Sequence, residues 1–146
     1  MLRKFGIIAV LSLIVAALAA VPALAANPHE VANNPIVCTE VQTAQGPAVR
    51  CSGSIAGLGG ADRVTISLSV GLACETRSGS NQPGGHLQAR TDPLTVRSGR
   101  VNFNVTSPAA RCPRGLNPVV GNTATITVRE FPSGDVLATF TRTILP

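Results

Sequence analysis

Residues 63–72, with the sequence Arg63-Val-Thr-Ile-Ser-Leu-Ser-Val-Gly-Leu72, determine the fold class that this chain predicts. Apolar residues occupy every second position of the segment: Val64, Ile66, Leu68, Val70 and Leu72. Successive side chains of a β-strand point to opposite faces of its sheet, so a period of two places all five on one face. The segment is therefore expected to form a strand with one buried face and one face in water.

The same alternation recurs on both sides of this segment. Further strands are predicted at 36–41, 49–55, 94–96, 101–106, 123–129 and 136–144. These runs are rich in Val, Ile and Thr and are separated by turn-forming residues, which is the pattern of strands joined by turns. Seven short strands within residues 36–146 predict a single all-β domain, an antiparallel immunoglobulin-like sandwich, and a small β-barrel is the alternative architecture.

The composition supports one compact domain and excludes several classes of protein. Hydrophobic residues make up 45% of the 146 residues and charged residues only 13%, which is too apolar for a disordered chain. The 14 Gly and 11 Pro exclude a coiled coil or a helical repeat array. The chain has no Trp and no Tyr, so it lacks the aromatic faces on which sugar-binding modules usually stack their ligands.

Residues 1–25 have the three-part layout of a secretory signal peptide. Arg3 and Lys4 give a positive start, residues 7–21 form a nearly unbroken apolar run, and small residues lead to Ala25. A retained membrane anchor is the competing interpretation, but a run of fifteen residues falls short of the ~20 needed to cross a bilayer. Cleavage after Ala25 would leave a secreted, extracellular or cell-envelope protein without a membrane span.

All four cysteines follow this signal, and an even number in a small exported chain predicts two disulfides. Of the three possible pairings we favour Cys38–Cys51 with Cys74–Cys112, because the first two lie on neighbouring strand-like runs joined by a turn at 44–47. The chain-entropy model gives about 3 kcal/mol for the short loop and about 4 kcal/mol for the long one. No Cys-x-x-Cys spacing occurs, so no metal or cofactor is expected.

The order of several turn motifs resembles a family of small exported bacterial β-proteins. The motifs are Ser54-Ile-Ala-Gly-Leu-Gly59, the alternating strand to Cys74, Asn81-Gln-Pro-Gly-Gly85, and Cys112-Pro113. The resemblance covers residues 52–128, and it implies the β fold, the Cys74–Cys112 pairing and no particular activity. The chain departs from the family pattern by Gln82, by extra residues before Asn81, and by the added Cys38 and Cys51.

Two segments lack the alternation of the predicted strands. Residues 26–35 are expected to form a flexible leader, and residues 75–93 form the longest irregular stretch. Irregular loops of this length within compact domains are usually functional or disordered, so 75–93 is the candidate interaction loop. The residues singled out in it are Arg77, Asn81, Gly84, Gly85 and His86.

Five arginines fall within 25 residues that contain one acid, Asp92. They are Arg90, Arg97, Arg100, Arg111 and Arg114, in a chain whose net charge is +5. Gathered on one face, they would attract a polyanion such as an anionic cell-envelope polymer, a lipid headgroup or a nucleic acid. The alternative, which we favour, is a solvated strand edge where charges discourage edge-to-edge pairing.

Residues suited to catalysis are sparse. A Ser–His–Asp hydrolase needs a base held by an acid and set against a nucleophile. His86 is the candidate base, with Asp92 as its acid. Ser78 or Ser80 would be the nucleophile, but all of them lie in one loop and no Gly-x-Ser-x-Gly elbow occurs.

The function predicted from these observations is a secreted, non-enzymatic binding or interaction module. Its expected partner is an extracellular protein or an anionic cell-envelope polymer. The alternatives are a protease inhibitor with Arg77 or Arg90 as bait, a structural envelope or matrix protein, and, least favoured, the hydrolase built on His86.

Overall fold

The computed structural model describes residues 26–146, and the signal predicted at 1–25 lies outside them. These residues form nine strands and no helix. In chain order the strands are β1 (His29–Glu30), β2 (Val37–Thr43), β3 (Gly46–Ala56), β4 (Arg63–Glu75), β5 (Asn81–Arg90), β6 (Leu94–Thr95), β7 (Val101–Thr106), β8 (Asn117–Glu130) and β9 (Val136–Leu145).

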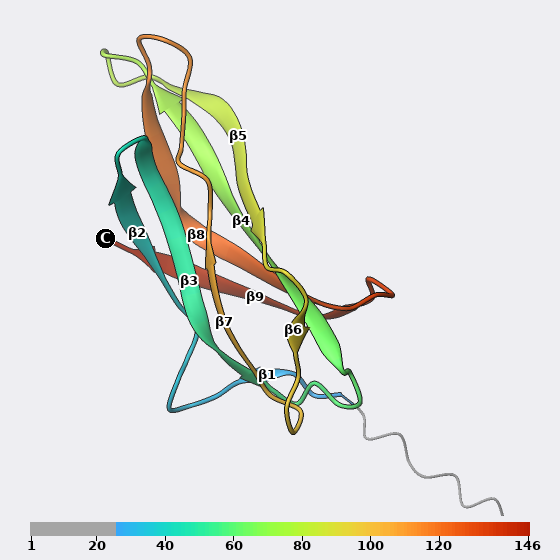
Figure 1. The fold of residues 1–146 in the computed structure, drawn as a ribbon. Coiled ribbons are helices and arrows are strands. Elements are labelled where there is room, and N and C mark those ends of the chain that lie inside the picture. The colour runs from blue at the N-terminus through green and yellow to red at the C-terminus, as the bar shows by residue number, and fades with distance from the viewer. Residues whose placement is uncertain (1–25) are drawn as a thin grey trace, which may run out of the picture.

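The strands form two layers that face each other across one core (Figure 1). In the first layer β3 is central, with β7 on one edge and with β2 and β1 along the other. The second layer has the order β9-β8-β4-β5, and β6 continues the β5 edge of β4. A short parallel pairing between β2 and β9 joins the layers, and the hydrogen-bonded path stays open. The predicted immunoglobulin-like sandwich is confirmed, but with nine strands instead of seven and with one parallel pair in place of a wholly antiparallel arrangement.

The core contains the apolar positions that the alternation predicted. Val64, Ile66, Leu68 and Val70 of β4 are at most 1% exposed. They pack with Ala124, Ile126 and Val128 of β8 and with Val49, Cys51 and Ile55 of β3. Large aliphatic side chains therefore fill the space between the layers, and burial of each contributes about 1.5–3 kcal/mol relative to exposure in water.

Both predicted disulfides are present. Cys38 and Cys51 are direct partners in the register of β2 and β3, with Cα atoms 4.1 Å apart. Cys74, at the end of β4, is bonded to Cys112 in the connection from β7 to β8, with Cα atoms 5.8 Å apart. The Cys38–Cys51 bond lies within the first layer. The Cys74–Cys112 bond links strand β4 of the second layer to the connection that follows β7 of the first layer.

The prediction of an irregular loop at 75–93 is wrong for most of its length. Residues 81–90 form strand β5, which pairs with β4 from Asn81 opposite Glu75 to Arg90 opposite Ser67. The register shifts between Leu72 and Ala73, where a Cβ on Gly84 would lie 2.9 Å from the Leu72 Cγ. Strand β5 is held by backbone hydrogen bonds to β4. Such bonds do not require alternating apolar side chains, so the sequence Asn-Gln-Pro-Gly-Gly shows no strand pattern.

The prediction of a flexible leader at 26–35 is also wrong from residue 29 onward. His29 and Glu30 pair with Ala56 and Ile55 of β3. The Ile36 amide donates a hydrogen bond to Glu30 Oε1 at 2.8 Å, and Glu30 forms a salt bridge with Arg142 of β9. The lack of alternation predicted a loose leader, and the sequence could not reveal its ionic partner, which is 112 residues away.

Candidate functional site

The outer face of the second layer carries polar side chains in register across four strands. These residues are the other half of the alternation whose apolar members fill the core. Two rows cross the sheet from β5 to β9. The first row is Gln88, Ser69, Thr125 and Thr141, and the second is Arg90, Ser67, Thr127 and Thr139.

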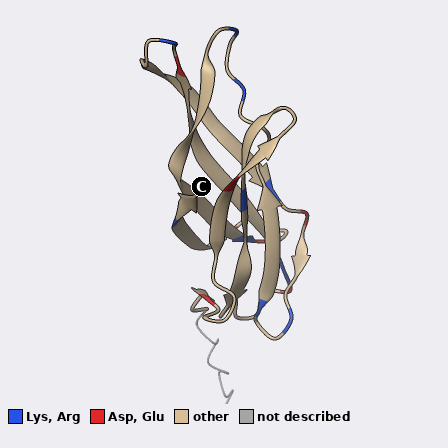
Figure 2. Cartoon of the chain, turned by 90° about the vertical axis from the view of Figure 1, so that its left-hand side faces the viewer, with Lys and Arg blue, Asp and Glu red and all other residues tan. Residues whose placement is uncertain are grey.

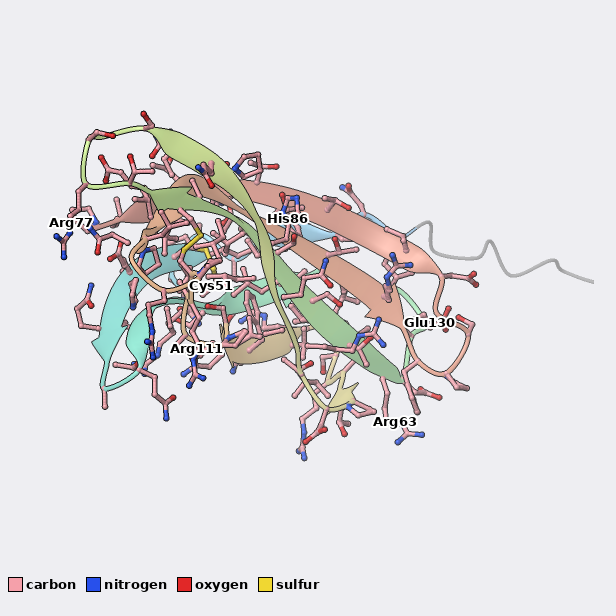
Figure 3. The ribbon with its side chains drawn as sticks, turned by 90° about the horizontal axis from the view of Figure 1, so that it is seen from above. Cys51, Arg63, Arg77, His86, Arg111 and Glu130 are labelled. Atoms are coloured by element: carbon pink, nitrogen blue, oxygen red, sulfur yellow. A yellow bond between two sulfur atoms is a disulfide. The ribbon has the colours of Figure 1, made fainter. Side chains whose placement is uncertain are left out.

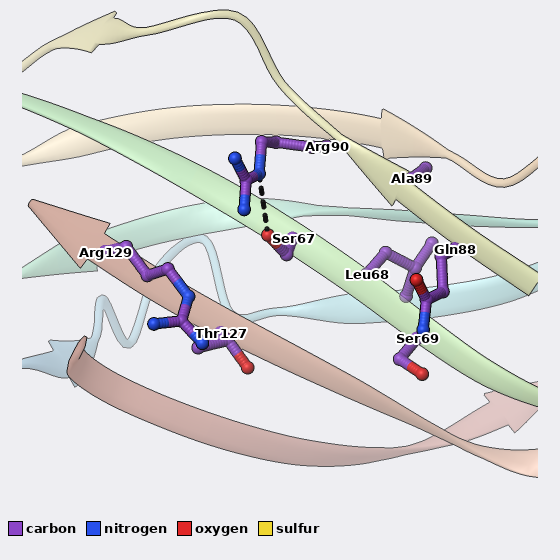
Figure 4. Close-up of a pocket in the computed structure, with 8 residues that line it drawn as sticks. All are labelled: Ser67, Leu68, Ser69, Gln88, Ala89, Arg90, Thr127 and Arg129. Atoms are coloured by element: carbon purple, nitrogen blue, oxygen red, sulfur yellow. Dashed lines mark hydrogen bonds between the residues drawn. The ribbon is translucent and has the colours of Figure 1, made fainter. Parts of the chain in front are cut away.

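A shallow groove of about 410 Å³ lies over the β5 end of these rows (Figure 4). Ser67 and Ser69 of β4 form its floor. Gln88 and Arg90 of β5 line one side, and Thr127 and Arg129 of β8 line the other. Because β4 separates β5 from β8, the two guanidinium groups flank a strip of hydroxyl groups.

Both arginines keep most of their hydrogen-bond donors free. Arg90 Nε donates to Ser67 Oγ at 3.3 Å, and an Arg129 terminal nitrogen donates to the Gly134 carbonyl at 3.1 Å. A guanidinium has five N–H donors in a planar fork, which suits carboxylate, sulfate and phosphate oxygens. Within residues 26–146 the one salt bridge is Glu30–Arg142, so neither Arg90 nor Arg129 has a carboxylate within salt-bridge distance.

Acids approach the arginines from one side. A neighbouring hollow, also lined by Arg90 and Arg129, contains Asp92 and Glu130. No Asp or Glu is among the residues that line the groove in the described part of the chain. The electrostatic potential therefore favours an anion located above the hydroxyl strip and disfavours an anion in the hollow.

The five arginines predicted as one cluster do not share one face. Arg97 and Arg100 form a bridge in the turn before β7, while Arg111 and Arg114 lie after β7. A six-residue strand spans about 20 Å, so the two pairs lie at opposite ends of the molecule. Figure 2 accordingly shows basic residues on loops at both ends.

Arg129, which is not among the site residues predicted from the sequence, is the partner of Arg90 in the groove. It is 39 residues away in the sequence, outside the window in which the five arginines gather. The available signal was its place in the polar half of the alternation of β8, beside Thr125 and Thr127. That signal becomes useful only when the neighbours of β8 are known.

The residues predicted for the interaction loop are spread along the β4–β5 hairpin. Arg77 lies in the turn at one end, and His86 lies farther along β5 (Figure 3). The turn is closed by hydrogen bonds from the Gly79 amide to the Thr76 carbonyl and from the Thr76 amide to the Ser80 carbonyl. Asn81, Gly84 and Gly85 belong to β5.

The residues of the hydrolase alternative are not brought together. His86 is opposite Gly71 in the middle of the paired region. Ser80 and Asp92 are each six residues from His86, one in each direction, and an extended chain of that length spans about 20 Å. Ser78 lies beyond Ser80 in the closed turn, so no acid–base–nucleophile set forms around His86.

No group of three or more His, Cys, Asp and Glu side chains is arranged to hold a metal ion within residues 26–146. The same residues include no helix with the length and apolarity needed to cross a membrane.

Comparisons with known proteins leave the groove as the main guide to function. No protein-family model and no curated protein matches the sequence. Two solved structures are similar to 73% of this chain at 12% identity: Bacteroides uniformis β-glucuronidase 2 covalently bound to cyclophellitol-6-carboxylate aziridine, with a TM-score of 0.37, and Bacteroides uniformis β-glucuronidase, with a TM-score of 0.38. The present chain spans 12% of each of those chains, and the likeness carries no argument about activity.

Proposed function

We propose that this chain is a secreted or cell-envelope binding module, without enzymatic activity, that holds an anionic ligand between Arg90 and Arg129. The observation that carries the proposal is the pair of guanidinium groups, neither of them in a salt bridge, on either side of the hydroxyl strip of β4. The two disulfides fit an oxidising, extracellular compartment.

A polymeric anion fits this groove better than a small one. The groove is shallow and open to solvent, so each contact with an exposed guanidinium is weakened by water and salt. A chain of repeated anionic groups rebinds at high local concentration after each dissociation, and its affinity exceeds that of a single group. An anionic cell-envelope polymer is therefore the favoured class of partner.

The protease-inhibitor alternative receives no support from the geometry. An inhibitor presents its bait residue on an exposed, extended backbone that enters the protease cleft. Arg77 lies in a closed hydrogen-bonded turn, and Arg90 lies in a strand that is paired with β4.

The test is a binding measurement with two matched double variants. Arg90→Ala/Arg129→Ala removes both groove arginines, and Arg97→Ala/Arg100→Ala removes the same charge at the turn before β7. Immobilised polyphosphate at low salt is expected to retain the wild type and the control and to release the groove variant at least about tenfold more readily. Equal weakening by both variants would show that net charge alone causes retention and would overturn the proposal.

A further inference from the structure

The groove opens onto a wider surface of hydroxyl groups. Three pairs of threonines face each other across β8 and β9: Thr123–Thr143, Thr125–Thr141 and Thr127–Thr139. On the other side of β8, Ser67 is opposite Thr127 and Ser69 is opposite Thr125. We call these six threonines and two serines the hydroxyl platform.

Strand propensity explains a threonine at any one of these positions, because threonine suits an exposed strand. It does not explain why the set is uniform. The outer face of the first layer, formed by the same kind of exposed strands, mixes hydroxyl side chains with amides and a charge: Thr39, Arg50, Ser52, Asn102, Asn104 and Thr106. On β4, β8 and β9 of the second layer, every outward position from Ser67 to Ser69, from Thr123 to Thr127 and from Thr139 to Thr143 instead carries a hydroxyl, with Arg90 of β5 and Arg129 of β8 beside them.

The dimensions of the platform fit an extended chain. Adjacent strands are about 4.8 Å apart, so each row runs about 14 Å from β5 to β9. A single phosphate between the arginines would leave most of this width uncovered. A chain that crosses the strands would place one anionic group at the arginines and neutral groups over Thr127 and Thr139.

The side chains also select among anionic polymers. The chain has no Trp or Tyr, and Phe103 and Phe140 belong to the core side of their strands. Phe131 lines the neighbouring hollow with Arg63 over its ring, and no aromatic residue lines the groove itself. Ligand recognition in the groove therefore depends on hydrogen bonds and charge. Flexible polyol units present hydroxyl groups that both donate to and accept from serine and threonine.

We infer that the ligand is a linear polymer of polyol units joined by phosphodiesters, which lies across β5, β4, β8 and β9 along the rows. This inference rests on the proposed function, because it names the ligand class for the same groove. The phosphate is held by Arg90 and Arg129, and the polyol hydroxyls bond to the platform.

The experiment compares two polymers of equal phosphate number, poly(glycerol phosphate) and polyphosphate. Only the first carries hydroxyl groups between its charges. The wild type is expected to bind poly(glycerol phosphate) about tenfold more tightly than polyphosphate, through a few added hydroxyl contacts. Free glycerol phosphate is the third probe and is expected to bind at least about a hundredfold more weakly than its polymer.

The decisive variant is Thr127→Val/Thr139→Val/Thr141→Val, which removes three hydroxyls and keeps the shape and strand preference of the side chains. It should bind the two polymers equally, with its polyphosphate affinity unchanged. The control is Thr95→Val/Thr106→Val, two exposed threonines outside the platform. Thermal unfolding of each variant checks that the fold is intact, and Ser67→Ala/Ser69→Ala provides a second removal of hydroxyls.

The outcomes separate this inference from the proposed function. Equal wild-type affinity for both polymers, or a preference that survives the valine substitutions, would overturn the polyol ligand and leave the anion groove standing. Free glycerol phosphate binding as tightly as its polymer would overturn the extended ligand. Failure of both polymers to bind would overturn the groove and the inference together.

Discussion

In the layer built on β3, buried polar side chains form hydrogen bonds with residues that are distant in the sequence. Ser54, only 3% exposed, accepts a hydrogen bond from Asn34 at 2.6 Å and also bonds to Asn102. The Ser107 hydroxyl accepts one from the Val49 amide at 2.9 Å. On the outer face of the layer built on β4, Thr139, Thr141 and Thr143 instead face solvent.

This difference suggests that the polar groups of the first layer stabilise the fold, whereas those of the second layer are available for binding. Buried polar groups that are satisfied by specific partners hold one arrangement of the chain, and removing one partner leaves the other unsatisfied. Exposed hydroxyl and guanidinium groups contribute little to stability and remain available to a ligand. We therefore expect substitutions of the hydrogen-bonded polar residues in the first layer to change stability. Substitutions on the outer face of the second layer should change ligand binding.

The largest effect is expected from the disulfides. Replacing Cys74 and Cys112 by Ala should lower the free energy of unfolding by about 4 kcal/mol, because this bond closes a loop of 38 residues and ties the two layers together. Replacing Cys38 and Cys51 should cost about 3 kcal/mol, because the loop is 13 residues and the strands are already paired. Urea unfolding measures both losses, and the reverse order would contradict the loop-length argument.

An intermediate effect is expected at the salt bridge that holds the leader. The hydrogen bond from Arg142 holds the pKa of Glu30 below its usual value of 4.5, against a smaller opposing effect of desolvation. A carboxyl with a lowered folded pKa stabilises the fold above its unfolded pKa, and this contribution is lost as the pH falls through the folded value. Glu30→Gln should therefore cost about 1 kcal/mol at neutral pH.

The measurement is urea unfolding of wild type and Glu30→Gln between pH 7 and pH 3. The gap in stability should narrow below about pH 4.5, as the wild-type carboxyl becomes protonated. Glu40→Gln serves as the control, because Glu40 forms no salt bridge within residues 26–146. A difference in unfolding free energy that stays constant with pH would mean that the charge of Glu30 does not stabilise the position of residues 26–35.

The smallest effect on stability is expected at the groove. Arg90→Ala/Arg129→Ala should change the free energy of unfolding by no more than about 0.5 kcal/mol per substitution, because both side chains lie on the outer face of the sheet. Thermal unfolding of the variant used in the binding test provides the measurement. A loss of unfolding free energy comparable to that of a disulfide would show that surface side chains also stabilise the second layer. That result would remove the contrast between the layers.

Much of the sandwich could be predicted from the sequence because burial acts on every second residue. Burial alternates with the sequence from Ile66 to Val70 and from Val101 to Val105, whereas Thr65 is buried although it lies in the polar half of the alternation. The hairpin disulfide could also be predicted, since Cys38 and Cys51 lie on runs joined by a short turn. Strand β5 could not, because its pairing uses backbone groups that every residue has, and only Leu87 on it is buried.

The candidate site was less predictable than the fold. Proximity in the sequence suggested that Arg90 belongs with Arg97 and Arg100, but the strand order places it across β4 from Arg129. In a sheet, neighbours are set by register between strands, and the register of β5, β4 and β8 depends on packing contributed by the whole chain.

The sequence by itself determined the all-β class, the strands with a clear apolar alternation and the pairing of the four cysteines, because these depend on local periodicity and short loops. Only the tertiary structure decided where residues 29–35 lie, that residues 81–90 form a strand, and that Arg90 and Arg129 flank the hydroxyl strip of β4. The reason is physical: contacts between distant segments depend on strand order and register, and these arise when the core is buried rather than from any single segment.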